Sequence, residues 1–475
     1  NYQQYAANRN SSLRLEPLES RLLLSVMDNL RVTEIMYNPA DPTPTEIDSG
    51  YADNDLFEYI ELMNTGASVL DLTGVTFAEV VGEGIIFDFS GSNVTSLDPG
   101  EYVLVVRNQA AFTARYGAGL AGQIAGVYTG DLDNGGEVIT LKSGVDVVQE
   151  FDYNDDWYTI TDGSGFSLTI RDAASTDLDD WDDDGGWRPS ESYNGTPGAG
   201  DSYQTSIIIN EIMAHTDTQT GDWVEFYNTT AQAVNIGGWY LSDNGKNLTK
   251  YKIDNDTFIP AHGYLVLNQD QHFGTGLTGF GLSENGEEVY LVEAAGDDII
   301  SYVDYQSFRA SESETSFGTY VKSTGGDDFV AMQDPTPSSA NSDPKIGPIV
   351  ISEIMYNPTS DLDMEEYIKL TNITGLPVTL QDTVKDITLA NPAGSDITLP
   401  WSFTDGIEFT FSLGTTIPAY GSLIIAKDTA AFTVAYGAIP GIQVLGPFTG
   451  SLANGGEDVE LSKAGDKVEG VQYYI

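Results

Sequence analysis

The chain has 475 residues, a net charge of −52 and a sequence pI near 4.1. A surface this acidic repels phosphate backbones and anionic lipids and attracts dissolved cations, so we predict divalent cations as partners and exclude nucleic acid. The absence of cysteine excludes disulfides and thiolate metal sites, and no apolar run is long enough to span a membrane.

The first 27 residues contain a segment that resembles a protein-sorting signal. RLEPLESRLLLS at residues 14–25 is similar to the Leu-Glu-Pro…Arg-Leu-Leu-Leu-Ser sorting segment of exported proteins in planctomycete-type bacteria. The alternative is an amphipathic helix start that happens to contain three leucines. The resemblance implies an extracellular or cell-surface bacterial protein, and we leave residues 1–27 out of the fold prediction.

The rest of the chain repeats itself. TEIMYNP at residues 33–39 returns as SEIMYNP at 352–358, and YTGDLDNGGEVITL at 128–141 returns as FTGSLANGGEDVEL at 448–461. A weaker middle copy has INEIMAH at 209–215 and LSENGEEVYL at 282–291. These offsets predict three repeats at residues 28–200, 204–343 and 347–475, the first two ending in the turn-rich linkers GTPGAGD and PTPSSANSD.

Within each repeat the pattern is strand after strand. VLVV at 103–106, YLVL at 264–267 and LIIA at 423–426 each follow a turn that contains Pro or Gly, and YIEL at 59–62 alternates apolar and polar residues. NGGE at 134–137 predicts a hairpin turn, and only residues 109–116 look helical. Many short strands predict an all-β fold in which two sheets stack as a β-sandwich.

The order of phrases carries a family resemblance. EIMYNP, EYIEL, PGEYVLVV, NGGEVITL and GTPGA, in this order, resemble the bacterial lamin-tail domain. The resemblance implies tandem immunoglobulin-like β-sandwiches in three copies. The third copy lacks a counterpart of residues 154–198, so we expect the natural chain to continue past Ile475 and the third sandwich to be the least stable.

One acidic stretch has the spacing of a calcium loop. In DWDDDGGWRPSE, Asp180, Asp182, Asp184 and Glu191 occupy positions 1, 3, 5 and 12 of an EF-hand-type loop, and Gly185 occupies position 6. Hard oxygen ligands at this spacing predict a bound Ca²⁺ ion. The alternative is a solvated acidic loop, because no helix-forming sequence flanks the stretch.

A second acidic set recurs in all three repeats, at the first two strands of each. Its members are Glu34, Glu211 and Glu353 on the first strand and Glu58, Asp222 and Glu366 before the second. Recurrence within one chain favours a requirement of the fold over three active sites. Trp157, Trp181 and Trp187 leave open a sugar-binding surface or a core position.

No nucleophile motif, metal-spaced histidine pair or phosphate-binding loop appears in the sequence. We therefore expect no catalysis by this chain. The first hypothesis is an exported structural and adhesive protein that binds a cell-surface protein or polysaccharide and is stabilised by cations. The alternative is the accessory, substrate- or carbohydrate-binding region of a larger secreted hydrolase or nuclease.

Overall fold

The computed structural model describes residues 26–79, 82, 84–201, 206–216, 221–276, 278–323, 326–360, 362–454 and 456–475. The predicted sorting segment at residues 14–25 lies outside this range. Internal contacts divide the chain into two compact units. The first comprises Asn1–Gln204, Gly245–Asn247 and Val292–Val303, and the second comprises Thr205–Asn244, Leu248–Leu291 and Asp304–Ile475.

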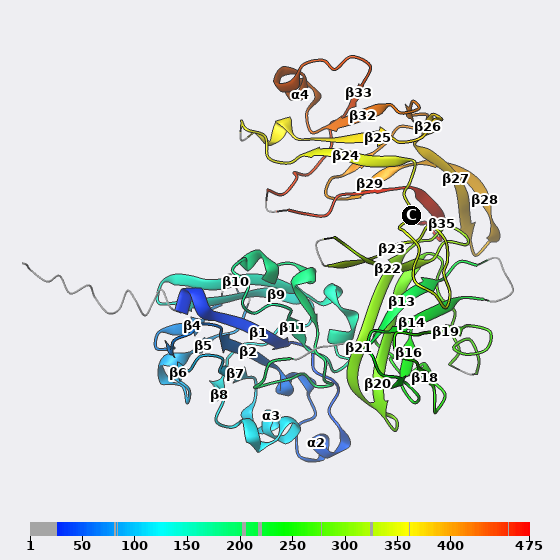
Figure 1. Ribbon diagram of the computed structural model, residues 1–475. Coiled ribbons are helices and arrows are strands. Elements are labelled where there is room, and N and C mark those ends of the chain that lie inside the picture. Colours follow the sequence, from blue (N-terminus) through cyan, green and yellow to red (C-terminus); the bar gives the residue numbers. More distant parts are fainter. Residues whose placement is uncertain are drawn as a thin grey trace, which may run out of the picture. The chain divides into compact units, whose positions relative to one another are not determined.

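The first compact unit contains an immunoglobulin-like sandwich built by the first repeat (Figure 1). One sheet has the order β12 (Trp187–Pro189), β11 (Leu168–Ile170), β1 (Leu30–Met36), β2 (Tyr59–Asn64), β7 (Tyr102–Val106) and β8 (Ile124–Val127). The other has the order β10 (Asp146–Asn154), β9 (Gly136–Ser143), β4 (Val75–Phe77) and β5 (Phe87–Asp88). A short pair joins β3 (Leu70–Asp71) to β6 (Ser96–Leu97). The first sheet pairs β1 on both sides, so every residue of β1 is buried.

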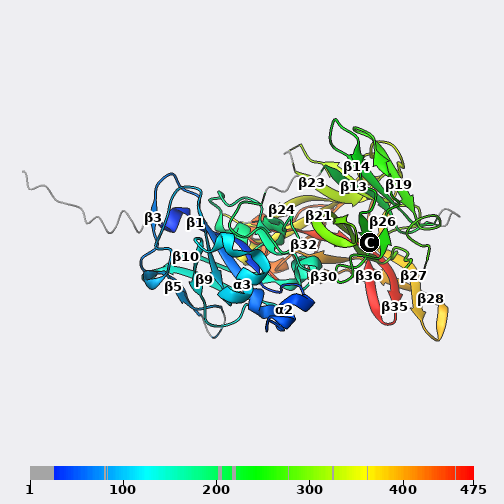
Figure 2. The ribbon, with the colours of Figure 1, turned by 90° about the horizontal axis from the view of Figure 1, so that it is seen from below.

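Two short helices pack beside this sandwich (Figure 2). Helix α3 (Gln109–Tyr116) confirms the predicted helix, and the Asn108 side chain caps it by accepting two backbone N–H bonds. Helix α2 (Pro44–Asp48) was not predicted, although Thr43 and Glu46 form a capping box around Pro44. Glu46 also receives two hydrogen bonds from the guanidinium of Arg115 in α3, at 3.0 and 3.1 Å, which joins the two helices.

The predicted hairpin turn at NGGE is wrong. The strand that follows it, β9, pairs with β10 and β4, whereas the strand before it, β8, belongs to the other sheet. The turn therefore carries the chain between sheets. Gly136 has a φ of +100°, and a Cβ there would collide with the backbone carbonyl of Tyr153. The Glu137 carboxylate accepts the N–H groups of Asp133 and Gly84, at 3.3 and 2.7 Å, and holds the loop in place.

The second compact unit contains the sheets of the third repeat and most of those of the middle repeat, whose residues Val292–Val303 belong to the first unit. The middle repeat has a five-stranded sheet: β19 (Tyr264–Asn268), β14 (Trp223–Asn228), β13 (Ile207–Met213), β22 (Phe317–Val321) and β23 (Asp327–Ala331). Its second sheet has the order β17 (Tyr251–Lys252), β16 (Tyr240–Ser242), β20 (Gly286–Ala295) and β21 (Asp298–Arg309), and β15 (Val234–Asn235) pairs with β18 (Phe258–Ile259).

The third repeat has four sheets and helix α4 (Thr429–Tyr436), the counterpart of α3. The first is β24 (Ile349–Met355), β25 (Tyr367–Asn372), β32 (Ser422–Ala426) and β33 (Gln443–Leu445). The second sheet has the order β28 (Asn391–Pro400), β27 (Gln381–Thr388), β35 (Ala464–Val468) and β36 (Val471–Tyr474). The third has the order β30 (Phe409–Thr410), β29 (Ser402–Asp405) and β34 (Glu460–Ser462). In the fourth, β26 (Val378–Thr379) pairs with β31 (Thr416–Ile417). The sheets follow the three sequence repeats while the compact units number two, so the exact domain boundaries stay a prediction.

Candidate functional site

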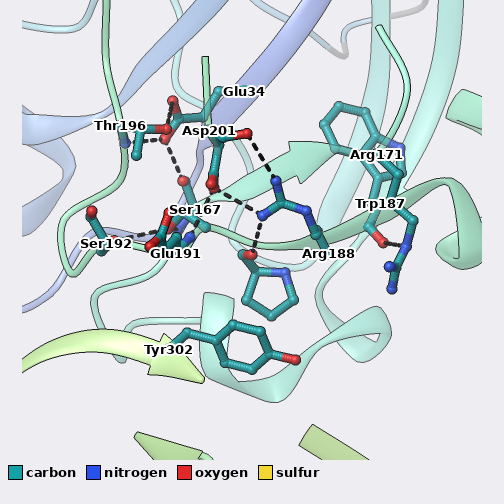
Figure 3. Close-up of polar contacts among 12 residues, drawn as sticks. Glu34, Ser167, Arg171, Trp187, Arg188, Glu191, Ser192, Thr196, Asp201 and Tyr302 are labelled. Carbon is teal, nitrogen blue, oxygen red and sulfur yellow. Dashed lines mark hydrogen bonds and ion pairs between the residues drawn. The ribbon is translucent and has the colours of Figure 1, made fainter. Parts of the chain in front are cut away.

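Glu34 lies on β1, and donors from several parts of the first repeat surround its carboxylate; Figure 3 shows Ser167 and Thr196 turned toward it. Its Oε1 accepts hydrogen bonds from the hydroxyls of Tyr59 and Ser167, each at 2.5 Å, and from the Thr196 N–H at 2.8 Å. Its Oε2 accepts the Thr196 hydroxyl at 3.2 Å. Glu34 is only 1% exposed, and this burial raises its pKa above the ordinary range.

Glu61 lies opposite Glu34 in the register of β1 and β2. Its two carboxylate oxygens accept the Thr33 hydroxyl at 2.7 Å and the Gly198 N–H at 2.6 Å. Burial, together with the neighbouring Glu34 charge, raises the pKa of Glu61 well above its ordinary value. The two glutamates therefore titrate as a pair that retains protons to a higher pH than exposed glutamates do. We call Glu34, Glu61, Ser167, Thr196 and Gly198 the Glu34 cluster.

The predicted linker at residues 195–201 is part of the fold, because it supplies two of the five residues of this cluster. Thr196 and Gly198 bond to Glu34 and Glu61. Gly195, with a φ of +82°, lets the backbone pass so close that a Cβ there would collide with Glu34 and with the Tyr59 hydroxyl. The carboxylates of β1 and β2 thus hold the end of the repeat against its beginning.

A buried ion pair fixes the same segment a few residues later (Figure 3). The Asp201 carboxylate accepts the guanidinium of Arg188 on β12 at 2.9 Å and the Glu191 N–H at 2.8 Å. The Asp201 side chain is fully buried and that of Arg188 is 8% exposed. Each charge therefore depends on the other for compensation.

The middle repeat builds the same arrangement from different residues. Glu211 accepts the Ser316 hydroxyl at 2.5 Å, the Thr336 N–H at 3.0 Å and the Thr336 hydroxyl at 2.9 Å. Glu225, opposite Glu211 in the register, accepts the N–H of Ser338, and burial raises its pKa to about 7. The predicted linker PTPSSANSD is therefore also part of its repeat. We call these five residues the Glu211 cluster.

The carboxylate before the second strand has a separate role. Glu58 lies just ahead of β2, and its Oε2 accepts the Tyr128 hydroxyl and, at 3.2 Å, the Leu132 N–H. Its Oε1 is buried and has no hydrogen-bond partner among the described residues. Burial raises the pKa of Glu58 to about 8, so the group is mostly protonated at neutral pH and carries little uncompensated charge.

The other two repeats use the same contact. Asp222 accepts the Leu282 N–H at 2.8 Å, and Glu366 accepts the Leu452 N–H at 3.1 Å. In all three repeats this carboxylate fixes the loop that leads into the second sheet. The glutamates that act as neighbours are thus Glu34 and Glu61, whereas Glu58 bonds to a different part of the fold.

The acidic stretch at residues 180–191 is anchored by its tryptophans. Trp181 and Trp187 are both fully buried. The indole N–H of Trp181 donates to the Val32 carbonyl, and that of Trp187 donates to the Trp181 carbonyl, each at 2.9 Å. A sugar-binding surface built on these two rings is therefore wrong, because both belong to the core. Trp157 is half-buried.

Three of the predicted calcium ligands lie on or beside two short turns, Leu178–Trp181 and Asp184–Gly186, and Glu191 lies beyond the strand that follows them. Asp180 is half-buried, Asp182 and Asp184 are exposed, and Glu191 follows β12. Asp182 accepts the Asp152 N–H at 2.8 Å. Within the part of the chain that the structure describes, no three acidic or histidine side chains gather closely enough to hold a metal ion. Calcium binding here stays a prediction.

Sequence reasoning missed the donors of both clusters and the second glutamate of each. A signal was present, because a Thr-Pro dipeptide ends both repeats and a Ser followed by Leu or Phe recurs before it, at Ser167 and Ser316. These short phrases read as turns when taken alone. Their pairing with Glu34 and Glu211 depends on contacts more than 100 residues apart in the chain.

The recurring carboxylates accept hydrogen bonds from the donors of their own repeat, which is what structural carboxylates do. Among the described residues, no helix combines the length and the apolar character needed to cross a membrane. The comparisons match no curated protein and no solved structure. A family model, the Lamin Tail Domain, matches residues 25–155 and 201–307, which fall in the first and middle repeats. Since these two regions make up half of the sequence, the chain belongs to the lamin tail domain family.

Proposed function

We propose that the chain is an exported or cell-surface bacterial protein with a structural and adhesive role and no catalytic activity of its own. One observation carries this proposal. The carboxylates that recur in the first and middle repeats, Glu34 and Glu211, each accept a serine hydroxyl and both polar groups of a threonine from their own repeat. Acids held in this way close the fold and are not free to transfer protons to a substrate.

The charge supports the choice of partner. With 72 acidic residues against 20 basic ones, the surface favours divalent cations and disfavours nucleic acid. A cell-surface protein or a polysaccharide is the partner that suits tandem β-sandwich domains outside the cell. The resemblance of residues 14–25 to a sorting segment supports export. Fusing residues 1–27 to a reporter protein and measuring its secretion in a planctomycete host tests this part.

The absence of catalysis is tested with the purified chain and polysaccharide, ester and nucleic-acid substrates. We expect no turnover above the buffer blank. Turnover that is lost in a Glu58→Gln variant would overturn the proposal, because the amide keeps the shape of the acid and cannot exchange its proton. The alternative, an accessory region of a larger secreted hydrolase or nuclease, is tested separately by reading the natural sequence past residue 475, where a domain with a catalytic constellation would favour it.

Calcium stabilisation is a separate part of the proposal. If Asp180, Asp182, Asp184 and Glu191 bind Ca²⁺, excess calcium raises the melting temperature by mass action, and Asp182→Ala removes this increase. The matched control is Asp179→Ala, which changes the same loop outside the predicted ligand set. Equal melting curves in calcium and in chelator would reject the site and leave the structural role untouched.

A further inference from the structure

An ion pair in the middle repeat joins the two ends of the loop between β16 and β17. The ammonium of Lys250, just before β17, contacts the Oδ1 of Asp243, just after β16. The side chain of Lys250 is 22% exposed and that of Asp243 is 10% exposed, so little water reaches either group. The pair formed by Lys385 and Asp396 on the hairpin of β27 and β28 is, in contrast, exposed on both sides.

Aromatic rings enclose the ammonium of this buried pair. The Nζ of Lys250 lies 4.9 Å from the ring centre of Phe280, which is itself buried. Phe273 is stacked on Phe280, with the two ring centres 5.0 Å apart. An apolar wall of this kind keeps bulk water away, which favours a condensation that releases water and slows the reverse hydrolysis.

A third ionisable group, Glu287, lies near the beginning of β20, the strand next to β16 in the sheet. The corresponding strands of the first repeat, β4 and β9, are antiparallel, so the end of the one lies beside the beginning of the other. The Glu287 carboxylate accepts the Ser283 N–H at 2.6 Å. Burial raises the pKa of Glu287 to about 7, the charge of Asp243 acts in the same direction and that of Lys250 opposes it. Glu287 is therefore coupled to both members of the ion pair.

These groups are the two reactants and the proton carrier of an amide condensation. An amine that is held in contact with a carboxyl group has already lost the translational freedom that a bimolecular encounter would cost. A carboxyl group that is close to half-protonated at neutral pH can both donate and accept a proton during such a reaction.

We propose that the Nζ of Lys250 and the Cγ of Asp243 join in an intramolecular amide bond, with Glu287 transferring the protons. One proton first passes from the ammonium to the Asp243 carboxylate, which leaves an amine and a neutral acid. The nitrogen then attacks Cγ and forms the N–C bond. Glu287 protonates the departing hydroxyl and takes one proton from the nitrogen, so the C–O bond breaks, one water molecule leaves and Glu287 returns to its starting state.

The amide closes the loop of residues 243–250 covalently in a chain that has no cysteine. The reaction takes place once in each molecule and within the chain, so it is separate from any turnover of external substrates. The inference rests on the geometry of the middle repeat and stands whether or not the protein is exported.

Mass spectrometry of the purified whole chain tests the proposal. After unfolding in denaturant, the wild type should weigh one water molecule less than its sequence requires. Trypsin cleaves after Lys246, which lies between Asp243 and Lys250, so these two residues should remain together only through the amide. A succinimide at an Asp-Gly step such as Asp184-Gly185 also loses one water, and the joined peptides distinguish the amide from it.

Two variants assign the roles of the side chains. Lys250→Arg keeps the positive charge but has no nucleophilic amine, so it should have its full sequence mass. Glu287→Gln keeps an oxygen for the Ser283 N–H but cannot transfer protons. After a short pulse of expression, its joined fraction should grow about 100-fold more slowly than that of the wild type. The exposed pair of Lys385 and Asp396 is the control in the same digest and should yield no joined peptide.

Three results would overturn the proposal: a full sequence mass in the wild type, a loss of water that the peptides assign to a succinimide, or a joined species that persists in Lys250→Arg. Equal rates in Glu287→Gln and in the wild type would overturn the role of Glu287. Unchanged circular dichroism of both variants shows that they fold, and the mass of the wild type decides the main point without either of them.

Discussion

The strands β1 and β24 share a sequence motif but differ in how deeply they are buried. Both end in Glu-Ile-Met and are followed by Tyr-Asn-Pro, and both pair with the next long strand in the same register, with Glu34 opposite Glu61 and Glu353 opposite Lys369. Yet all seven residues of β1 are buried, whereas only Ile349 is buried in β24. The local sequence motif determines that a strand forms and that it pairs with the next long strand. Segments far away in the chain determine whether the glutamate is buried.

A contact that needs no distant strand is the same in all three repeats. Asn64, Asn228 and Asn372 end the second strand, and the amide of each donates to a carbonyl four residues later, at 2.7 or 2.8 Å. Each also donates to a backbone carbonyl of a short strand further along its repeat, namely Leu97 in β6, Ile259 in β18 and Ile417 in β31. The third repeat therefore shares this local turn with the other two, and the described strands differ in how β24 is paired.

The largest difference between the two regions should appear on removal of the first glutamate. Glu34→Ala leaves the hydroxyls of Tyr59 and Ser167 and the Thr196 N–H buried without their acceptor, which should cost about 3 kcal/mol. Glu353→Ala, at a half-exposed carboxylate, should cost less than about 1 kcal/mol. Denaturant-dependent hydrogen exchange at β1 and β24 measures each locally. Equal losses at both strands would mean that the cluster does not stabilise the first repeat.

A second contrast uses equivalent glycines of the turn before the second sheet. Gly136→Ala should destabilise the first repeat by about 3 kcal/mol, because the new Cβ collides with the backbone of Tyr153 in addition to straining φ. Gly456→Ala also has a positive φ but meets nothing within 4 Å, and it should cost about 1 kcal/mol. Thermal melting of the two variants gives the comparison, and an equal effect would assign the whole cost to backbone strain.

The third contrast concerns pH and the buried acid before the second strand. Burial raises the pKa of Glu58 from 4.5 to about 8, so the folded chain binds more protons than the unfolded chain between these values. Stability should therefore fall as the pH rises through this window, by on the order of 2 kcal/mol once water penetration is allowed for. Glu58→Gln should remove this fall, and melting temperatures between pH 5 and pH 8 test it.

The matched variant for this experiment is Glu366→Gln in the third repeat. Its carboxylate lies 3.4 Å from the Lys427 ammonium, and both side chains are largely buried. Loss of the negative charge leaves the Lys427 ammonium without its carboxylate partner, so this variant should be less stable than the wild type. A stabilising effect of Glu366→Gln would contradict the difference that we draw between the two sites.

The smallest effect should be the pH dependence of the stability that Glu353 of β24 contributes, which has the opposite sign to that of Glu34. The hydrogen bond from Tyr367 lowers the pKa of Glu353, so its contribution is present above the ordinary pKa and is lost as the pH falls through the lowered value. Burial raises the pKa of Glu34, which gives the opposite slope. Melting of Glu353→Gln from about pH 3 to pH 7 should differ from wild type only at the upper end, by less than about 1 kcal/mol.

The sequence predicted those parts of the fold that depend on neighbouring residues. The strands at residues 59–62, 103–106, 264–267 and 423–426 and the helix at 109–116 are all present, because apolar alternation and an Asn cap act within a few residues. The all-β sandwich and the family followed from the order of these phrases. The hairpin prediction at NGGE failed because Asn-Gly shows that the chain turns and does not show which sheet it enters next.

The candidate site was less predictable for a physical reason. The recurrence of Glu34 and Glu211 was visible in the sequence, but Ser167 and Thr196 reach Glu34 from segments more than 130 residues away. Glycine, proline and threonine at residues 195–197 have the composition of a linker, and only contact with buried carboxylates makes them part of a domain. The tryptophans did not decide between surface and core either, since an indole flanked by five aspartates, as Trp181 is, suits a surface as well as a core.

The Glu34 cluster has a mechanical consequence. The first repeat begins at β1 and ends near Asp201, and one carboxylate on β1 holds the segment that leaves the domain. On the carboxyl side, a force that pulls the two ends of this repeat apart loads the Asp201–Arg188 ion pair first, then the bonds of Gly198 to Glu61 and of Thr196 to Glu34, and only then β12. Since several short polar bonds must break in turn, the domain resists extension at its point of closure, and the length of chain released before β12 is loaded is only the few residues between β12 and Asp201.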